Sequence, residues 1–239
     1  MIRKNKSLYL TLIFLPFYFI CDAQRSIKDT VFILREIMGN DTYHAVFVDK
    51  DKNSKYYNWI TDFKFNSFDS ISYNGAINLL KDRFPGGFSS HRIKARSKNW
   101  IPLYLYKNKY YAYVPSDKGY NNWIQITDTT FIEYNMEGPM PSILNSFRKI
   151  DQRQFQFGLW DIQKMQTKIN AYIIDPKRQI AVFEFIGKNE KNRYKLMVNA
   201  GHIKYFPVIV NYCISEKVAE VEFQIPNYNR LINGRLLKK

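Results

Sequence analysis

The sequence predicts a mainly β protein: an antiparallel sheet forming a barrel or a sandwich, with two or three short helices. The chain contains 18 tyrosines and 18 phenylalanines, which lie with valine and isoleucine in short runs typical of strands. Asp, Asn, Lys and Gly separate these runs, and the connections are short, as antiparallel hairpins require. An α+β fold, with helices on one face of an open antiparallel sheet, is the alternative.

Thirteen runs of this kind are the expected strands. They cover Thr30–Ile37, Tyr43–Asp49, Lys55–Phe65, Trp100–Tyr106, Tyr110–Pro115, Trp123–Thr127, Thr130–Tyr134, Gln154–Leu159, Ile169–Ile174, Ile180–Phe185, Arg193–Val198, His202–Cys213 and Val218–Gln224. The clearest turns are residues 49–54, 107–109, 175–178 and 187–190, where Asn, Asp and Gly tolerate left-handed conformations and proline fixes φ.

Two helices are expected between these strands. Residues 72–84 place four apolar side chains near one helical face and stop at a Pro-Gly-Gly turn. Residues 142–150 place Ile143 and Phe147 on one stripe, with a serine as N-cap. The segment 27–38 also fits a helical face, but its β-branched run favours a strand.

The first 23 residues have the three parts of a cleavable signal peptide: a basic start, an apolar run and a short polar exit. The apolar run, Leu8 to Ile20, is 13 residues long, whereas a bilayer core needs about 20, so an uncut membrane anchor is disfavoured. Small residues at the required positions predict cleavage between Ala23 and Gln24. The alternative is an outer-membrane lipoprotein anchored through Cys21.

The remaining segment, 24–239, contains no linker, repeat or low-complexity stretch and is expected to form a single β-rich globular domain without a transmembrane segment. Its expected location is the periplasm or the extracellular space. It retains one cysteine, Cys213, which has no second cysteine to pair with. Because Cys213 lies in an apolar run, we interpret it as a packed side chain.

The chain is strongly basic, with a formal net charge of +15 that becomes +13 once the signal peptide is removed. Such a protein is attracted to polyanions. The expected partners are therefore an anionic envelope component, a glycan or a protein, with peripheral membrane contact and no specific nucleic acid. The lysines are scattered along the chain, however, and this scatter favours a surface that only confers solubility over one that binds polyanions.

No stretch satisfies the pattern of a metal site. Residues 49–60 resemble a calcium-binding loop, but Ser54 replaces the required glycine and Ile60 the required glutamate. The stretch is therefore interpreted as a hairpin turn. The three histidines lack the spacing that presents two imidazoles to one metal, and they are assigned to strand faces (His44, His202) and a loop (His91). We expect no metal and no cofactor.

Catalytic signatures are also missing from the sequence. Residues 86–91 combine glycines, serines and a histidine but lack the Gly-x-Ser-x-Gly elbow of a nucleophile. Pairs of acids such as Glu133 and Glu137 carry no flanking signature of glycoside hydrolysis. The catalytic residues are therefore left unassigned.

Aromatic residues are the one feature in excess, and four tryptophans are among them. The best candidate for an exposed binding platform is the loop 117–123, and its candidate binding residues are Lys118, Tyr120 and Trp123. Packing is the favoured interpretation of Trp123, because this residue begins a predicted strand.

Two functional hypotheses follow. The first is a non-enzymatic module of the cell envelope that binds a ligand, a glycan or a protein; a barrel with an apolar ligand inside is one version. The second is an envelope hydrolase that acts on glycan or lipid through residues brought together only by the fold.

Overall fold

Strands dominate the computed structural model, which describes residues 30–38, 41–91, 93, 98–117, 122–187, 193–214 and 218–234. The predicted signal peptide, its cleavage site at Ala23 and Gln24, and Cys21 lie outside the described residues. The mainly β class is confirmed, in its barrel version and with a second sheet beside the barrel.

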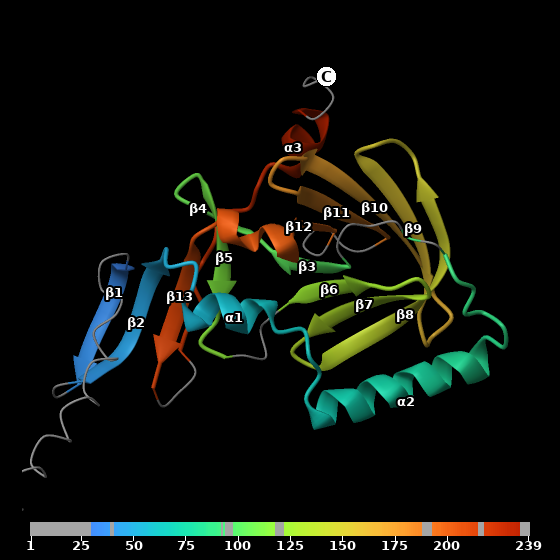
Figure 1. Cartoon of the computed structure of the whole chain (residues 1–239), viewed down its shortest axis with the longest axis horizontal. Coiled ribbons are helices and arrows are strands. Elements are labelled where there is room, and N and C mark those ends of the chain that lie inside the picture. Colours follow the sequence, from blue (N-terminus) through green and yellow to red (C-terminus); the bar gives the residue numbers. More distant parts are fainter. Residues whose placement is uncertain are drawn as a thin grey trace, which may run out of the picture.

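Eight antiparallel strands close into the barrel, in the order β3-β6-β7-β8-β9-β10-β11-β12 (Figure 1). Most neighbours are joined by short hairpins, and β12 closes the circle by pairing with β3. The strands are β3 (Asn99–Pro102), β6 (Trp123–Ile126), β7 (Thr130–Asn135), β8 (Gly138–Lys149), β9 (Gln154–Trp160), β10 (Gln166–Asp175), β11 (Ile180–Ile186) and β12 (Tyr194–Asn199).

Large apolar side chains fill the barrel interior. Phe131, Phe183 and Phe185 are at most 1% exposed, and the ring of Phe131 lies within 6.5 Å of the other two. Ile124, Leu144, Ile169 and Met197 complete the packing around them. The version of the binding hypothesis that places an apolar ligand inside the barrel is therefore wrong, because phenylalanine rings occupy that space.

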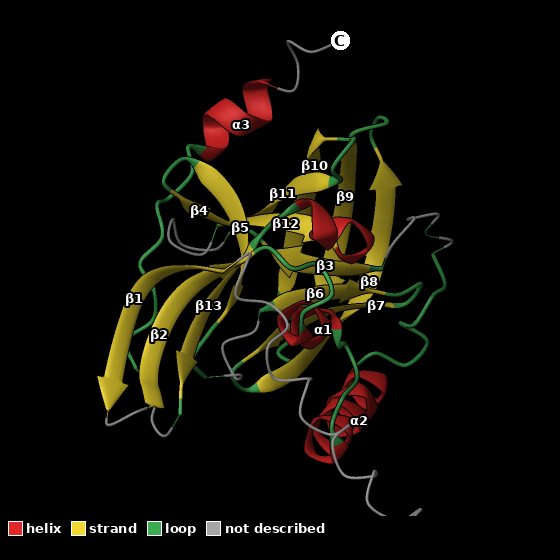
Figure 2. Ribbon diagram, turned by 60° about the vertical axis from the view of Figure 1, so that its left-hand side comes forward, coloured by secondary structure: helices red, strands yellow, loops and turns green. Residues whose placement is uncertain are grey.

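The second sheet has five strands in the order β1-β2-β13-β5-β4, and it stands beside the barrel (Figure 2). Strand β13 is inserted between β2, to which it is antiparallel, and β5, to which it is parallel. The strands are β1 (Thr30–Met38), β2 (Asp41–Asp49), β4 (Tyr104–Tyr106), β5 (Lys109–Val114) and β13 (Val208–Cys213).

One apolar layer joins the two sheets. From Ile180 to Phe185, strand β11 is buried on both faces, because alternate side chains point into the barrel and toward the five-stranded sheet. The outward set includes Ile180 and Val182, which belong to the same cluster as Phe47, Val208 and Val210 of the sheet. The barrel wall and the sheet therefore share a core.

Four helical segments of the described residues pack on this framework. Helix α2 (Ser67–Arg83) packs on the outer face of β8, and Tyr134 Oη donates to Asp69 Oδ2 at its start (2.9 Å). The other three are α1 (Lys55–Thr61), the 3₁₀ segment η3 (Ala200–Tyr205) and α3 (Tyr228–Gly234). In the described part of the chain, no helix combines the length and apolar character needed to cross a membrane.

The predicted strand Lys55–Phe65 is wrong, because its first part forms α1. Tyr57 and Ile60 are three residues apart and are the buried side chains of this helix, so the spacing is helical. The aromatic and β-branched composition suggested a strand instead. The Tyr57 hydroxyl donates to the carbonyl of Phe206, which holds α1 against the end of η3.

The predicted helix 142–150 is also wrong, because this segment belongs to strand β8. The outer face of β8 is covered by α2 and its inner face by the barrel core, so apolar residues do not simply alternate along it. A register shift between Leu144 and Ser146 changes which side chains of β8 face the barrel interior. Together these effects produce the spacing of Ile143 and Phe147 that resembles a helix.

Other segments also differ from the prediction. The expected strand 202–213 is divided: η3 comes first, with Asn199 Oδ1 accepting from the Gly201 amide (3.1 Å), and β13 begins after Pro207. The expected strand 218–224 forms only one isolated bridge, between Gln224 and Leu105. Helix α2 was predicted at residues 72–84 but begins at Ser67, because Asn66 caps it.

We expect Phe183→Ala to reduce the free energy of unfolding by about 3–5 kcal/mol, because it opens a cavity among the buried rings of the barrel. Ile186→Ala, at the exposed end of the same strand, is the control and should cost less than about 1 kcal/mol. Urea denaturation followed by circular dichroism measures both changes. Equal effects of the two substitutions would contradict a packed barrel interior.

Candidate functional site

The barrel wall has a notch where β3 leaves it. Strand β3 pairs with β12 only through residues 100–102, after which Leu103 donates its amide to the carbonyl of Leu196 (2.8 Å) and the chain continues into β4 of the other sheet. The register of β12 with β3 covers Met197 to Asn199 and ends before Tyr194 and Lys195. A groove of about 570 Å³ lies at this notch.

The groove is lined from three sides. The barrel contributes residues of β7 and β12, the β3–β4 connection contributes a second wall, and the segment 223–228 forms the third. These residues are Pro102, Leu103, Tyr104, Leu105, Asn122, Glu133, Asn135, Tyr194, Lys195, Leu196, Met197, Phe223, Gln224, Ile225, Pro226 and Tyr228. Aromatic, aliphatic, amide and charged side chains are thus combined at one place.

An ion pair lies on the barrel side of the groove. Lys195 Nζ is 2.7 Å from Glu133 Oε2, and the two side chains are 31% and 24% exposed. Lys195 lies opposite Phe183 of β11, and Glu133 lies opposite Ile124 of β6. Because Phe183 and Ile124 belong to the barrel core, both charged side chains are on the inward-facing side of their strands. The ion pair therefore separates the apolar interior of the barrel from the groove.

Backbone hydrogen bonds and ring contacts hold the segment 223–228 against the groove. The Gln224 amide donates to the carbonyl of Leu105 (2.9 Å), and Phe223 packs on Tyr104 with ring centroids 4.6 Å apart. Tyr228 stacks on Tyr194 at 4.9 Å. Burial, and then the charge of Glu220, raises the pKa of Tyr104 to about 12, so this hydroxyl keeps its proton at neutral pH.

The carboxylate of Glu184, which accepts several hydrogen bonds, lies beside the groove residue Tyr194. Glu184 accepts hydrogen bonds from Arg193 (2.7 Å from Nη2), from Tyr172 (3.0 Å) and from the groove residue Tyr194 (3.2 Å). Burial alone would raise the pKa of Glu184, but the hydrogen bonds from Arg193, Asn170 and Tyr172 outweigh it and lower the pKa. Glu184 therefore stays ionised and orients Tyr194 rather than supplying a proton.

A second polar network connects the five-stranded sheet to Glu220, in the segment that follows β13. Glu220 accepts from Ser116 Oγ (2.6 Å), from Asn211 Nδ2 (3.1 Å) and from the Tyr113 hydroxyl. Asn211 Oδ1 lies 2.9 Å from His44 Nε2. Serine, glutamate and histidine are thus brought together, but Asn211 stands between His44 and Glu220, and the hydrogen bonds of this network do not join His44 directly to Ser116.

The predicted platform loop is described only in part. Lys118 and Tyr120 lie outside the described residues, and their role in binding stays a prediction. Trp123 begins β6 and is 7% exposed; its ring stacks on Tyr134 at 4.7 Å and meets the edge of Phe63 at 5.4 Å. Its ring is therefore packed rather than presented as an open platform.

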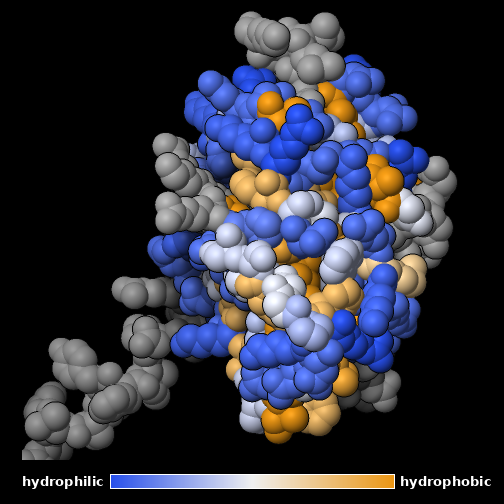
Figure 3. All heavy atoms as spheres, turned by 90° about the vertical axis from the view of Figure 1, so that its right-hand side faces the viewer, coloured by the Kyte–Doolittle hydropathy of each residue, from blue (hydrophilic) through white to orange (hydrophobic). Residues whose placement is uncertain are grey.

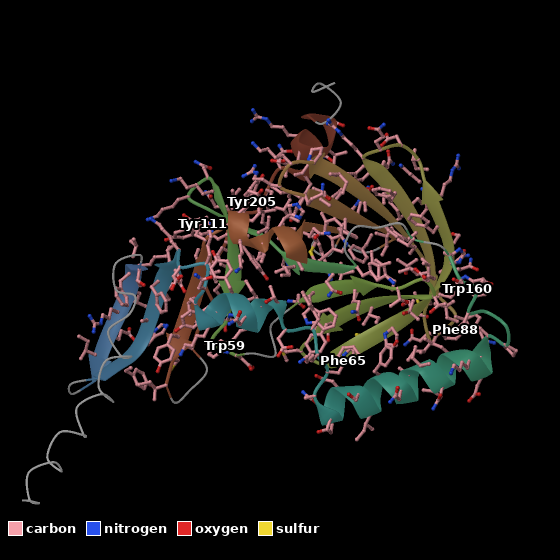
Figure 4. The ribbon with its side chains drawn as sticks, viewed as in Figure 1. Trp59, Phe65, Phe88, Tyr111, Trp160 and Tyr205 are labelled. Atoms are coloured by element: carbon pink, nitrogen blue, oxygen red, sulfur yellow. The ribbon has the colours of Figure 1, made fainter. Side chains whose placement is uncertain are left out.

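The aromatic residues around Trp123 come from the covering helices as well as the barrel. Figure 4 shows Trp59 on α1 and Phe65 in the connection that leads to α2. Phe65 lies 6.0 Å from Trp123, and Trp59 lines a small cavity together with Trp123 and Asn122. Asn122 lines the groove as well, so the end of the loop 117–123 lies at the groove.

The three histidines lie apart, as predicted, but their elements differ partly from the expectation. His44 lies on β2, His91 lies in a loop and donates its amide to the carbonyl of Asp128, and His202 lies in η3 rather than on a strand. Within the described ranges, no three His, Cys, Asp or Glu side chains gather as metal ligands.

The stretch resembling a calcium-binding loop is a turn, although it joins a strand to a helix rather than two strands. Asp49 Oδ1 accepts from the Asp51 amide (2.8 Å), and Asp51 Oδ1 accepts from the Asn53 amide (2.9 Å). These carboxylates stabilise the local backbone before α1. The interpretation of the segment as a hairpin turn is corrected accordingly.

Sequence reasoning missed the groove because its residues come from distant segments. Glu133 and Lys195 are 62 positions apart, and only the first two residues of the segment 223–228 belonged to a predicted strand. One signal in the sequence was relevant: Pro102 marks the place where β3 can no longer donate to a neighbouring strand.

Comparison of the chain with family models, with curated proteins and with solved structures gave no match. The groove and its surroundings are therefore the basis for a functional proposal.

We expect Glu184→Gln to lower the free energy of unfolding by about 1–3 kcal/mol at neutral pH, because it weakens charge-assisted hydrogen bonds. The folded-state pKa of Glu184 lies below its ordinary value of 4.5, so its stabilisation is complete above pH 4.5 and is lost as the pH falls through the folded pKa. The free energies of unfolding of the variant and the unmodified protein should therefore become more similar as the pH falls below 4.5. Urea denaturation at several pH values measures it, with Glu137→Gln at an exposed hairpin as control. A difference independent of pH would contradict the ionised role.

Proposed function

We propose that the protein is a non-enzymatic binding module of the cell envelope and that the groove binds a glycan. The observation that supports this proposal is the groove of about 570 Å³ with its mixed lining of tyrosines, amides and apolar side chains. Sites for small ligands commonly measure about 300–1,000 Å³ and combine apolar walls with a few polar groups.

The chemistry of the lining favours a sugar chain. Asn122, Asn135 and Gln224 offer amide donors and acceptors, which suit hydroxyl groups, and the tyrosines offer both rings and hydroxyls. Lys195 and Glu133 compensate each other's charge, so the floor of the groove does not select a strongly charged ligand. A neutral or weakly charged oligosaccharide fits this combination better than a polyanion.

The hydrolase alternative has less support. Glycoside hydrolysis requires two carboxyl groups on opposite sides of the scissile bond. Among the residues that line the groove, Glu133 is the single carboxylate, and Lys195 holds it in an ion pair. The groove therefore offers contacts for binding without the acid pair that this reaction uses.

The predicted signal peptide and the basic composition support a location in the envelope, outside the cytoplasm. The formal charge of +15, or +13 without residues 1–23, supports a second contact, with an anionic envelope surface, that is separate from the groove. Peripheral association of this kind keeps the protein close to envelope glycans.

Isothermal titration calorimetry of the purified protein with chitotetraose, cellotetraose and soluble peptidoglycan fragments tests the groove. We expect at least one of these probes to bind. The double variant Glu133→Gln/Lys195→Met should weaken that binding about tenfold, which corresponds to about 1.4 kcal/mol. It removes both charges together and leaves neither partner unpaired.

Gln166→Ala is the matched control, because Gln166 lines a separate surface depression of about 300 Å³ on the barrel. It should leave the affinity unchanged. The proposal fails if none of the three probes binds, or if the double variant binds as tightly as the unmodified protein.

The contact with an anionic surface has its own test. We expect the protein without residues 1–23 to be retained on vesicles containing phosphatidylglycerol at low salt and to be released as salt rises, because exposed charges are screened beyond about 8 Å at physiological ionic strength. Vesicles of phosphatidylcholine are the control. A lack of retention at low salt would rule out the anionic contact while leaving glycan binding in the groove unaffected.

A further inference from the structure

Helix α3 begins at the groove and lies at the edge of the molecule. Figure 1 shows it at the top, above β10 and β11, which it contacts. Its residues Tyr228, Leu231 and Ile232 are partly buried against the shared core, and none of its residues is fully buried. In the space-filling view, the surface at this end of the molecule is largely hydrophilic, with small apolar areas among the polar side chains (Figure 3). The helix is therefore attached to the core from outside.

The connection that leads to α3 is anchored at Gln224. The amide of Gln224 donates to the carbonyl of Leu105 (2.9 Å), and its side-chain Oε1 accepts from the amide of Asn108 (3.1 Å). The next residue, Ile225, is 86% exposed, and Pro226 has no amide hydrogen to donate. The firm attachment of this connection to β4 therefore ends before α3 begins.

A pair of stacked rings joins the start of α3 to the barrel. The ring of Tyr228 lies on that of Tyr194 of β12, with the centroids 4.9 Å apart and 17° between the ring planes. Tyr194 is itself held in place, because its hydroxyl donates to Glu184 Oε1 (3.2 Å) and the guanidinium of Arg193 lies 5.2 Å from its ring centroid. The ring of Tyr194 is therefore a fixed platform, whereas Tyr228 belongs to the peripheral helix.

Tyr228 lies where a sugar ring would bind. A pyranose has a face of C–H groups that packs flat on an aromatic ring, because the contact removes apolar surface of both rings from water. Tyr194 and Tyr228 both line the groove. A sugar stacked on Tyr194 in this way would take the place of the Tyr228 ring, and close packing excludes both at once. Tyr228 therefore competes with a sugar for the same surface.

We propose that Tyr194 is the sugar-stacking platform of the groove and that Tyr228 occupies it until a glycan binds, when α3 swings away about Ile225 and Pro226. This inference rests on the proposed glycan-binding function and adds the regulation of that site. Only the open form binds, so the apparent affinity is the intrinsic affinity reduced by the fraction of molecules that are open. The stack of two tyrosines thus makes α3 an autoinhibitory clasp.

Calorimetric titration with chitotetraose, cellotetraose and soluble peptidoglycan fragments tests the clasp. We expect Tyr228→Ala to bind the active probe about two- to tenfold more tightly than the unmodified protein, because it removes the ring pair that favours the closed form. Tyr228→Phe keeps the stacked ring and should bind like the unmodified protein. Asn229→Ala, at an exposed position of α3, is the matched control and should also leave the affinity unchanged.

Unchanged or weaker binding by Tyr228→Ala would overturn the inference, because Tyr228 would then be an inert or a contributing wall of the groove. The proposed function would stand in that case. If no probe binds either protein, the proposed function itself fails, and the assignment of Tyr194 as a platform fails with it.

Hydrogen–deuterium exchange followed by mass spectrometry tests the opening without any ligand. A helix of seven residues is not stable in isolation, so its amides exchange when it leaves the barrel. We expect residues 229–234 to exchange faster than residues 180–186 of β11, and Tyr228→Ala to accelerate the exchange of 229–234 while leaving β11 unchanged. Exchange of 229–234 that is as slow as that of β11, or that Tyr228→Ala does not accelerate, would overturn the opening of α3.

Discussion

The apolar layer between the barrel wall and the five-stranded sheet is the contact on which the rest of the structure depends. Strand β11 supplies its barrel side with Ile180 and Val182, and the sheet supplies Phe47, Val208 and Val210. Burying such a side chain stabilises the fold by about 1.5–3 kcal/mol. Without this layer the sheet would expose one whole face, so the barrel acts as the surface on which the sheet is assembled.

The groove is a consequence of how the two sheets are connected. The chain crosses from β3 to β4 at Leu103, and this crossing leaves the barrel wall incomplete beside β12. The protein therefore has a groove on its surface although its interior is filled, and the Lys195–Glu133 ion pair lies between this groove and the apolar core. Met197 also lies at this boundary, because it lines the groove and belongs to the apolar cluster of the barrel interior.

The sequence allowed prediction of the fold class and most strands, because residues such as those of 180–186 are β-branched or aromatic and lie between clear turns. It failed where burial on both faces or a register shift removed the alternation, as in β8. The groove was beyond prediction for a different reason. Glu133 and Lys195 form their ion pair only when the barrel closes, and no local sequence pattern predicts that closure.

The position of β13 has a consequence for the order in which the chain folds. The barrel consists mostly of hairpins between consecutive strands, which form through local contacts. The centre of the other sheet, in contrast, is filled by residues 208–213, between strands from the first half of the chain. As the polypeptide is synthesised from its N-terminus, the β1–β2 hairpin must wait for nearly the whole chain before its neighbour arrives. During that interval the apolar side chains of the hairpin lack the neighbouring strand that packs beside them in the folded protein.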